Sequence, residues 1–152
     1  MSRKAPFPEM MMCFPGKVKQ CMRFISAKYL TDTQIKPHYL PFITLIGKYD
    51  GLSQKELNEM IAVDKSHVST VVRELIDLGL IYNDGPGKLH SLHLTESGKN
   101  VFASCRMMYD LLNAKMFADF TDEEMEHLYV LTSKLDHALD DLIAEYSEKD
   151  IS

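Results

Sequence analysis

The sequence predicts a mainly helical protein with one small two-stranded sheet. Apolar residues recur at three- and four-residue steps over most of the 152 residues, which is the period of a helical face. Two short segments near the middle carry helix-capping residues on either side of a tight turn, and a glycine-rich turn then separates two short apolar runs. Hydrophobic residues make up 45% and charged residues 26% of the chain, which is the composition of an ordinary folded protein.

Two helices are predicted before the Asp50-Gly51 turn. From Gly16 to about Leu30 the apolar residues share one helical face, namely Val18, Cys21, Met22, Ile25 and Tyr29. A second helix should start near Pro37, because the fixed backbone angle of proline suits a first helical turn. It should end just before the Asp-Gly pair, which is a strong turn signal.

A pair of short helices joined by a tight turn follows. Ser53 can cap the first helix, and Glu56 can reach back to it as a capping box. This helix should end near Ile61. Asp64 is placed as the N-cap of the second helix, which should continue to Leu78 and stop at the following glycine.

The next segment predicts two short strands around a turn built on residues 84–87, Asp-Gly-Pro-Gly. Thr95 then serves as the N-cap of a long helix, although Gly98 weakens its first turn.

Thr121 and Glu124 form a second capping box. It opens a final helix whose apolar stripe continues to about Tyr146.

The charges are distributed unevenly along the chain. Residues 1–30 carry six Lys or Arg against Glu9 alone, a local +5, whereas residues 100–152 carry four against twelve acids, a local -8; the formal net charge is -5. Nucleic acid requires a positive surface only where phosphates lie, so an acidic C-terminal part does not exclude binding. It does exclude a wholly basic, histone-like protein.

The sequence does not indicate a zinc ribbon, a disulfide-rich secreted protein or a membrane protein. Cys13, Cys21 and Cys105 have an odd count and no CxxC spacing, which argues against a zinc ribbon or a secreted disulfide framework. No apolar run approaches the roughly 20 residues of a membrane span, and prolines interrupt any signal-like N-terminal core, so we expect a cytoplasmic protein.

Catalysis and metal binding are not indicated either. The sequence contains no HExxH, GxSxG or phosphate-loop motif, so we expect neither an enzyme nor a cofactor. His90 and His93 are an odd step apart on a strand, and His127 and His137 do not share a helical face, which disfavours a metal site.

The segment 64–78 separates into two faces at 100° per residue. One face is apolar and contains Val68, Val71, Val72, Leu75 and Ile76. The other has small hydroxyls and one guanidinium, with Lys65 and His67 at its edges; it contains Ser66, Ser69, Thr70 and Arg73. Such short side chains let a helix approach base edges inside a major groove about 12 Å wide. The pattern alone is not a specific code, but its context matches a helix-turn-helix with a β-wing.

The sequence also resembles a known family. The stretch GLSQKELNEMIAVDKSHVSTVVRELIDLGLI, followed by LTESGK, resembles the MarR family (multiple antibiotic resistance regulators) of winged helix-turn-helix transcription factors. The resemblance extends from about Gly16 to Tyr146. It implies a mainly α fold with a small β-wing, in which N- and C-terminal helices form a homodimer. Residues 1–32 would hold the first dimerisation helix, residues 33–99 the winged helix-turn-helix DNA-binding domain and residues 100–152 the C-terminal dimerisation helices.

The resemblance implies a sequence-specific regulator of transcription. Family members mostly repress by binding a pseudo-palindromic operator in double-stranded DNA, and a small molecule or thiol oxidation releases them. The alternative is a winged-helix module that binds another protein, although a partner-binding helix should expose apolar or aromatic anchors.

Carried over to this chain, the resemblance places Ser53 and Gln54 against phosphates. The residues that would face the groove are Lys65, Ser66, His67, Ser69, Thr70 and Arg73. Arg73 is the candidate for guanine recognition or a phosphate clamp, and the alternative is an ion pair with Glu74 or Asp77. His67 equally fits a solvent-exposed position.

The wing departs from the family pattern. The segment YNDGPGKLHS is about three residues shorter than a usual wing and has no Arg for the minor groove. Lys88 and His90 are its substitutes. We therefore expect weak contact with the minor groove, and we expect the helix at residues 64–78, the recognition helix, to contribute a larger share of the DNA affinity.

Two kinds of signal could release the protein from DNA, namely oxidation of a thiol and binding of a small molecule. Cys13 and Cys21 lie near and on the first helix, where oxidation-sensing relatives keep a reactive Cys; a buried structural role is the alternative. A small amphipathic or phenolic effector could bind in a pocket lined by Tyr29, His38, Tyr39 and Met108. Core packing is the alternative role for these residues.

Overall fold

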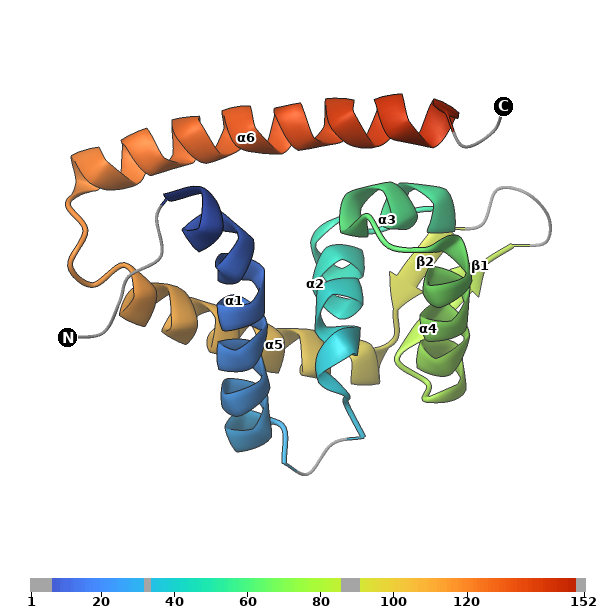
Figure 1. Cartoon of the computed structure of the whole chain (residues 1–152). Helices are drawn as coiled ribbons and strands as arrows, with labels where there is room; N and C mark the ends of the chain where they lie inside the picture. Colours follow the sequence, from blue (N-terminus) through green and yellow to red (C-terminus); the bar gives the residue numbers. More distant parts are fainter. Residues whose placement is uncertain (1–6, 32–33, 86–90, 150–152) are drawn as a thin grey trace. The chain divides into compact units, whose positions relative to one another are not determined.

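A computed structural model describes residues 7–31, 34–85 and 91–149. These residues form helices and one two-stranded antiparallel sheet (Figure 1). In chain order the elements are α1 (Phe7–Tyr29), the 3-10 helix η1 (Pro37–Tyr39), α2 (Leu40–Lys48), α3 (Gln54–Ile61), α4 (Lys65–Asp77), β1 (Ile81–Asp84), β2 (Ser91–Leu94), α5 (Glu96–Met116) and α6 (Asp122–Lys149). The predicted mainly helical architecture is confirmed.

The first helix is longer than predicted. It begins at Phe7 rather than near Gly16, and Pro15 lies inside it. Proline in a helix interior removes one backbone hydrogen bond and disfavours the helix by about 3 kcal/mol. The prediction stopped at this proline, but the helix runs through it because good helix formers, among them three consecutive Met residues, precede Pro15.

The α3–α4 pair has the predicted local chemistry at its start. The Ser53 N–H donates to Glu56 Oε2 at 2.8 Å, and the Glu56 N–H donates to Ser53 Oγ at 3.1 Å, so the capping box is present. Asp64 is the N-cap residue of α4, but its side chain makes no capping hydrogen bond. Its carboxylate therefore acts at this helix end through charge alone.

The end of α4 is a Schellman motif. Gly79 has a φ of +70°, and its N–H donates to the Ile76 carbonyl at 2.9 Å while the Leu80 N–H donates to the Leu75 carbonyl at 3.0 Å. Glycine adopts this left-handed conformation without steric cost, which is why the helix stops at the predicted place.

The wing strands pair as a hairpin with Ile81 opposite Leu94 and Asp84 opposite Ser91. The sheet has one further contact that the sequence did not predict, because Leu52 forms an antiparallel bridge with Leu92. The segment between α2 and α3 is thereby attached to the wing.

The core of the region that contains α2, α3, α4 and the wing is apolar and closely packed. It includes Phe42, Ile43, Ile46, Leu57, Val68, Val71, Leu75, Ile81 and Leu92, together with Cys105 and Met108 from α5. Burial of one such side chain contributes about 1.5–3 kcal/mol. This core fixes which face of α4 remains exposed.

The chain divides into two compact units, residues 1–112 and residues 113–152. The second unit contains α6, whose predicted capping box is present. The Thr121 N–H donates to Glu124 Oε2 at 3.0 Å, and the Glu124 N–H donates to Thr121 Oγ1 at 3.1 Å. Among the described helices none combines the length and apolarity needed to cross a membrane.

Candidate nucleic-acid interface

The two faces of α4 are separated largely as the helical wheel predicts. Val68, Val71, Val72 and Leu75 are buried in the core. Ile76, which we assigned to the same face, is instead 39% exposed, because it lies in the last turn where the chain is about to reverse at Gly79. The opposite face is open: Lys65, Ser66, Thr70 and Arg73 are exposed and Ser69 is half-buried.

Arg73 has no ion-pair partner among the described residues. Glu74, one of the two acids expected to compete for it, accepts a 2.5 Å hydrogen bond from the Tyr39 hydroxyl. That bond is the main cause that lowers the pKa of the Glu74 carboxyl, so the acid is charged but turned toward Tyr39 of η1. The Arg73 guanidinium is therefore left for an external acceptor such as phosphate or guanine.

Two of the predicted contact residues are already engaged within the chain. The Thr70 hydroxyl donates to the Ser66 carbonyl at 2.9 Å, and the Ser53 hydroxyl donates to Glu56 Oε2 at 2.8 Å. Both hydroxyl oxygens can still accept, but neither can donate to phosphate without giving up its present bond. Gln54, the first residue of α3, is half-buried.

The Glu56 carboxylate limits phosphate binding at the start of α3. Hydrogen bonds from the Ser53 backbone and side chain lower its pKa, so it is ionised at neutral pH. A phosphate placed there would meet this negative charge next to the positive helix end. The helix N-terminus alone is thus a weaker anion site than the sequence suggested.

His67 is not an isolated surface residue. Its ring lies 6.0 Å from the ring of His38 and 6.2 Å from the ring of Phe42, measured between centroids. The sequence placed His38 and His67 in different roles, and their proximity across 29 positions could not be read from local spacing. His38 lies in η1 and is exposed.

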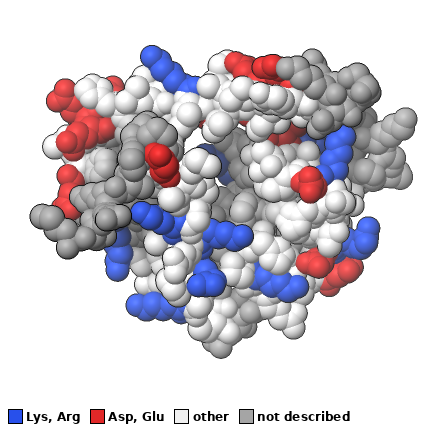
Figure 2. Space-filling model, viewed as in Figure 1, with Lys and Arg blue, Asp and Glu red and all other residues white. Residues whose placement is uncertain are grey.

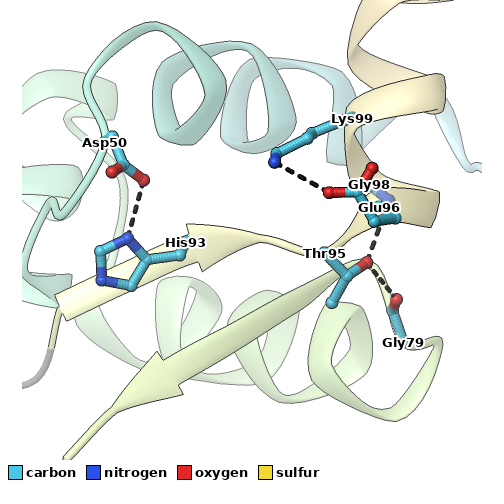
Figure 3. A network of polar contacts seen from close by, with 7 residues as sticks. All are labelled: Asp50, Gly79, His93, Thr95, Glu96, Gly98 and Lys99. Atoms are coloured by element: carbon cyan, nitrogen blue, oxygen red, sulfur yellow. Dashed lines mark hydrogen bonds and ion pairs between the residues drawn. The ribbon is translucent and has the colours of Figure 1, made fainter.

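The base of the wing contains a polar network that the sequence analysis missed (Figure 3). His93 Nδ1 lies 2.7 Å from Asp50 Oδ1. The His93 ring also stacks on Tyr82, with centroids 5.2 Å apart. Lys99 Nζ is 2.9 Å from Glu96 Oε1. Asp50, Tyr82, His93 and Lys99 help to line a cavity of about 320 Å³. No local signal could have found this pair, because Asp50 is brought beside His93 by the Leu52–Leu92 bridge between distant segments.

The wing contacts lie beyond what the structure describes. Lys88 and His90, our substitutes for the missing Arg, fall within residues 86–90, outside the described residues. Their proposed contact with the minor groove stays a prediction.

The candidate effector residues occupy different surroundings. Tyr39 and Met108 are buried in the core at 2% and 1% exposure, whereas Tyr29 and His38 are exposed. None of the four lines the 320 Å³ cavity at the wing. In the described part of the chain, no three His, Cys, Asp or Glu side chains form a group that could hold a metal.

The three thiols differ in accessibility. Cys13 and Cys21 on α1 are exposed, and Cys105 on α5 is buried. Burial raises the pKa of the Cys105 thiol to about 11, so it is protonated at neutral pH. The two cysteines considered as redox sensors are thus the two that an oxidant can reach.

Lys and Arg gather over the part of the surface where α1 lies (Figure 2). The helix contributes Lys17, Lys19, Arg23 and Lys28, all exposed. By contrast, α6 begins with Asp122, Glu123 and Glu124. The charge asymmetry along the sequence is therefore carried by surface residues of separate helices.

Comparison with known proteins gives a consistent fold. No family model matches the sequence. The HTH-type transcriptional regulator BilQ of Clostridium symbiosum (strain WAL-14163) is 27% identical over 99 residues, covering 63% of this chain and 69% of that protein.

Solved structures match over most of the chain. The transcriptional regulator SlyA aligns with a TM-score of 0.76 at 17% identity, covering 90% of this chain and 96% of that one. A putative MarR family transcriptional regulator from Listeria monocytogenes, crystallised with a 26mer DNA, aligns with a TM-score of 0.77 at 18% identity, covering 91% of each chain. MarR aligns with a TM-score of 0.73 at 19% identity, covering 95% and 98%. The chain therefore has the winged helix-turn-helix fold of the MarR family regulators, as its sequence resemblance implied.

Proposed function

We propose that this protein is a sequence-specific DNA-binding regulator of transcription. The observation that supports it most strongly is the exposed face of α4, where hydroxyls surround an Arg73 that has no ion-pair partner among the described residues. The fold would place this helix in a major groove, and the similar Listeria monocytogenes structure is described as a complex with DNA. The regulators that the chain resembles mostly repress, and we propose the same role here.

The packing of α4 explains how the face would work. Its buried valines and leucine pack into the core, and α4 lies against α3, so the exposed residues would reach the groove on a rigid support. The Tyr39–Glu74 hydrogen bond keeps the neighbouring acid away from Arg73. Lys65 and the small hydroxyls would then supply phosphate contacts and close approach, while Arg73 would supply base recognition or a phosphate clamp.

A homodimer is part of the proposal. Helix α6 exposes a row of apolar side chains, from 36% to 62%, namely Leu128, Leu131, Leu135, Leu139, Leu142 and Ile143. Exposed apolar surface of this extent is typical of an interface, and a second copy would bring two α4 helices to a pseudo-palindromic site. Residues 1–32 and 100–152 would supply the dimer contacts, and residues 33–99 the DNA contacts.

Release of the DNA is proposed to follow either a small amphipathic or phenolic effector or oxidation of an exposed thiol. Cys13 and Cys21 are accessible to an oxidant, which supports the second route. Loss of DNA binding after peroxide treatment, absent in a variant with both cysteines replaced by serine, would identify it.

Selection of bound sites from random double-stranded DNA tests the central claim. We expect a pseudo-palindrome with half-sites about one helical turn apart. On the selected site Arg73→Ala should weaken binding by about 1–3 kcal/mol, or 5- to 150-fold. Arg106→Ala, which removes an exposed arginine from α5, is the matched control and should leave the affinity nearly unchanged.

The result also separates the alternatives. No enrichment from the DNA pool would favour a winged-helix module that binds protein. If Lys88→Ala changes neither the affinity nor its salt dependence while Arg73→Ala abolishes binding, the wing contributes nothing to the contact.

A further inference from the structure

Two histidines from separate elements meet beside the first turn of the recognition helix α4. His67 is the third residue of α4, and His38 lies in η1 immediately before α2; their ring centroids are 6.0 Å apart. Both side chains are exposed. Because the His38 ring lies beside the ring of His67 in this turn, it would lie at the edge of any groove that the start of α4 enters.

Among the described residues, the charged groups that act on the His38 side of this pair are Lys36 and Glu74. Lys36 precedes η1, with its Nζ 5.5 Å from the centre of the Tyr39 ring, and Glu74 lies on α4. Partial burial, and then Lys36, lower the pKa of His38 below its ordinary value of 6.5, while Glu74 opposes this shift. Glu74 is held by the Tyr39 hydroxyl, so its charge is already partly compensated. At neutral pH His38 in the free protein is therefore mostly uncharged.

We propose that His38 and His67 form a proton-dependent contact with the DNA phosphate backbone, so that DNA binding by this chain takes up protons. The inference rests on the proposed function, and it adds to it a contact by His38 and a sensitivity to pH. Lys36 extends the same edge with a permanent positive charge. A phosphate oxygen is the acceptor that fits, because imidazolium, unlike neutral imidazole, donates from both ring nitrogens.

The sign of the effect follows from linkage. A phosphate beside an imidazole favours the charged form, so the histidine pKa is higher in the complex than in the free protein. The complex then binds more protons than its free components, and the affinity must rise as the pH falls through the window between the two pKa values. Each histidine that is neutral when free and protonated when bound adds up to about tenfold in affinity per pH unit.

The test is the dissociation constant for the selected DNA site between about pH 5.5 and 8 at constant ionic strength, measured by fluorescence anisotropy in a chelating buffer. The wild-type chain should bind roughly three- to tenfold more tightly per unit decrease in pH. The double variant His38→Gln with His67→Gln should lose most of this slope while keeping measurable binding through Arg73 and Lys65. His137→Gln, which removes an exposed histidine from α6, is the matched control and should keep the wild-type slope.

A second variant fixes the charge instead of removing it. His38→Lys should bind at pH 8 about as tightly as the wild-type chain binds in acid, with a reduced slope. A slope in the double glutamine variant equal to that of the wild-type chain would overturn the inference while leaving the proposed function in place. No binding to any DNA at any pH would instead remove the proposed function itself. Far-UV circular dichroism of each variant separates either result from loss of the fold.

Discussion

Gly98, in the first turn of α5, should be intolerant of even one added methyl group. An ideal Cβ built at this position would lie 1.9 Å from the Leu80 carbonyl oxygen and 3.3 Å from Leu94 Cδ2. The same Leu80 oxygen accepts the Thr95 N–H at 3.0 Å. The Thr95 hydroxyl in turn donates to the Gly79 carbonyl at 2.6 Å and accepts the Gly98 N–H at 3.0 Å (Figure 3). These bonds attach the start of α5 to the end of α4.

The size of the effect follows from what must move. Ordinary contact begins near 3.4 Å, so the helix and the Leu80 carbonyl must separate by roughly 1.5 Å. Overpacking of this kind costs about 1–3 kcal/mol, and a lost hydrogen bond adds about 1 kcal/mol. Alanine offsets about 1 kcal/mol through its better helix propensity. Because the atom in the way is a backbone oxygen, which cannot rotate aside, we expect a cost near the upper end of this range. Gly98→Ala should lower the free energy of unfolding by about 3 kcal/mol.

Urea unfolding followed by far-UV circular dichroism measures this directly, at one fixed protomer concentration because a dimer would couple stability to concentration. The expected decrease corresponds to a melting temperature lower by roughly 6–12 °C. Gly16→Ala is the matched control, since nothing lies within 4 Å of a Cβ built there. That substitution should stabilise the chain by up to about 1 kcal/mol. A Gly98→Ala variant as stable as the wild-type chain would refute the close approach.

Two further predictions concern caps and thiols. Ser53→Ala should lower the unfolding free energy by about 1 kcal/mol in urea titration, because the N-cap of α3 is lost. Hydrogen bonds from Ser53 lower the pKa of the Glu56 carboxyl, whose ordinary value is 4.5. The stability that this carboxylate contributes should therefore be complete above pH 4.5 and disappear as the pH falls through the lowered pKa. A stability that rises on acidification over that range would contradict the capping box. With a thiol reagent at neutral pH, Cys13 and Cys21 should react rapidly and Cys105 only on unfolding. Rapid reaction of all three in the folded chain would show that the core around Cys105 opens.

Local chemistry made much of the fold predictable from the sequence. The capping boxes at Ser53 and Thr121 involve residues three apart, and the stop at Gly79 depends on one residue's backbone freedom. Such signals act within one helical turn, so the sequence order alone reveals them. The predicted start of α1 was wrong because a proline is a local signal against a helix, and it was outweighed by its neighbours.

Gly98 shows where local reasoning ends. Judged from the sequence alone, Gly98 is a poor helix former that weakens the first turn of the helix. In the fold it is the only residue type that permits α5 to lie against the Leu80 carbonyl without strain. The reason is a contact between elements, and no periodicity or capping pattern contains that information.

At the candidate interface, too, a contact between distant residues could not be predicted from local sequence, and this contact decides whether Arg73 has an ion-pair partner. The sequence offered Glu74, the next residue, and Asp77, about one helical turn further on, as ion-pair partners for Arg73. Neither ion pair is found among the described residues. The Tyr39 hydroxyl, 35 positions away, takes the Glu74 carboxylate instead and leaves the guanidinium for an external anion. Tyr39 was considered only for an effector pocket or for core packing, yet its ring is buried while its hydroxyl faces α4. The DNA-contacting potential of α4 therefore depends on a residue of η1, the element that also brings His38 to the same helix.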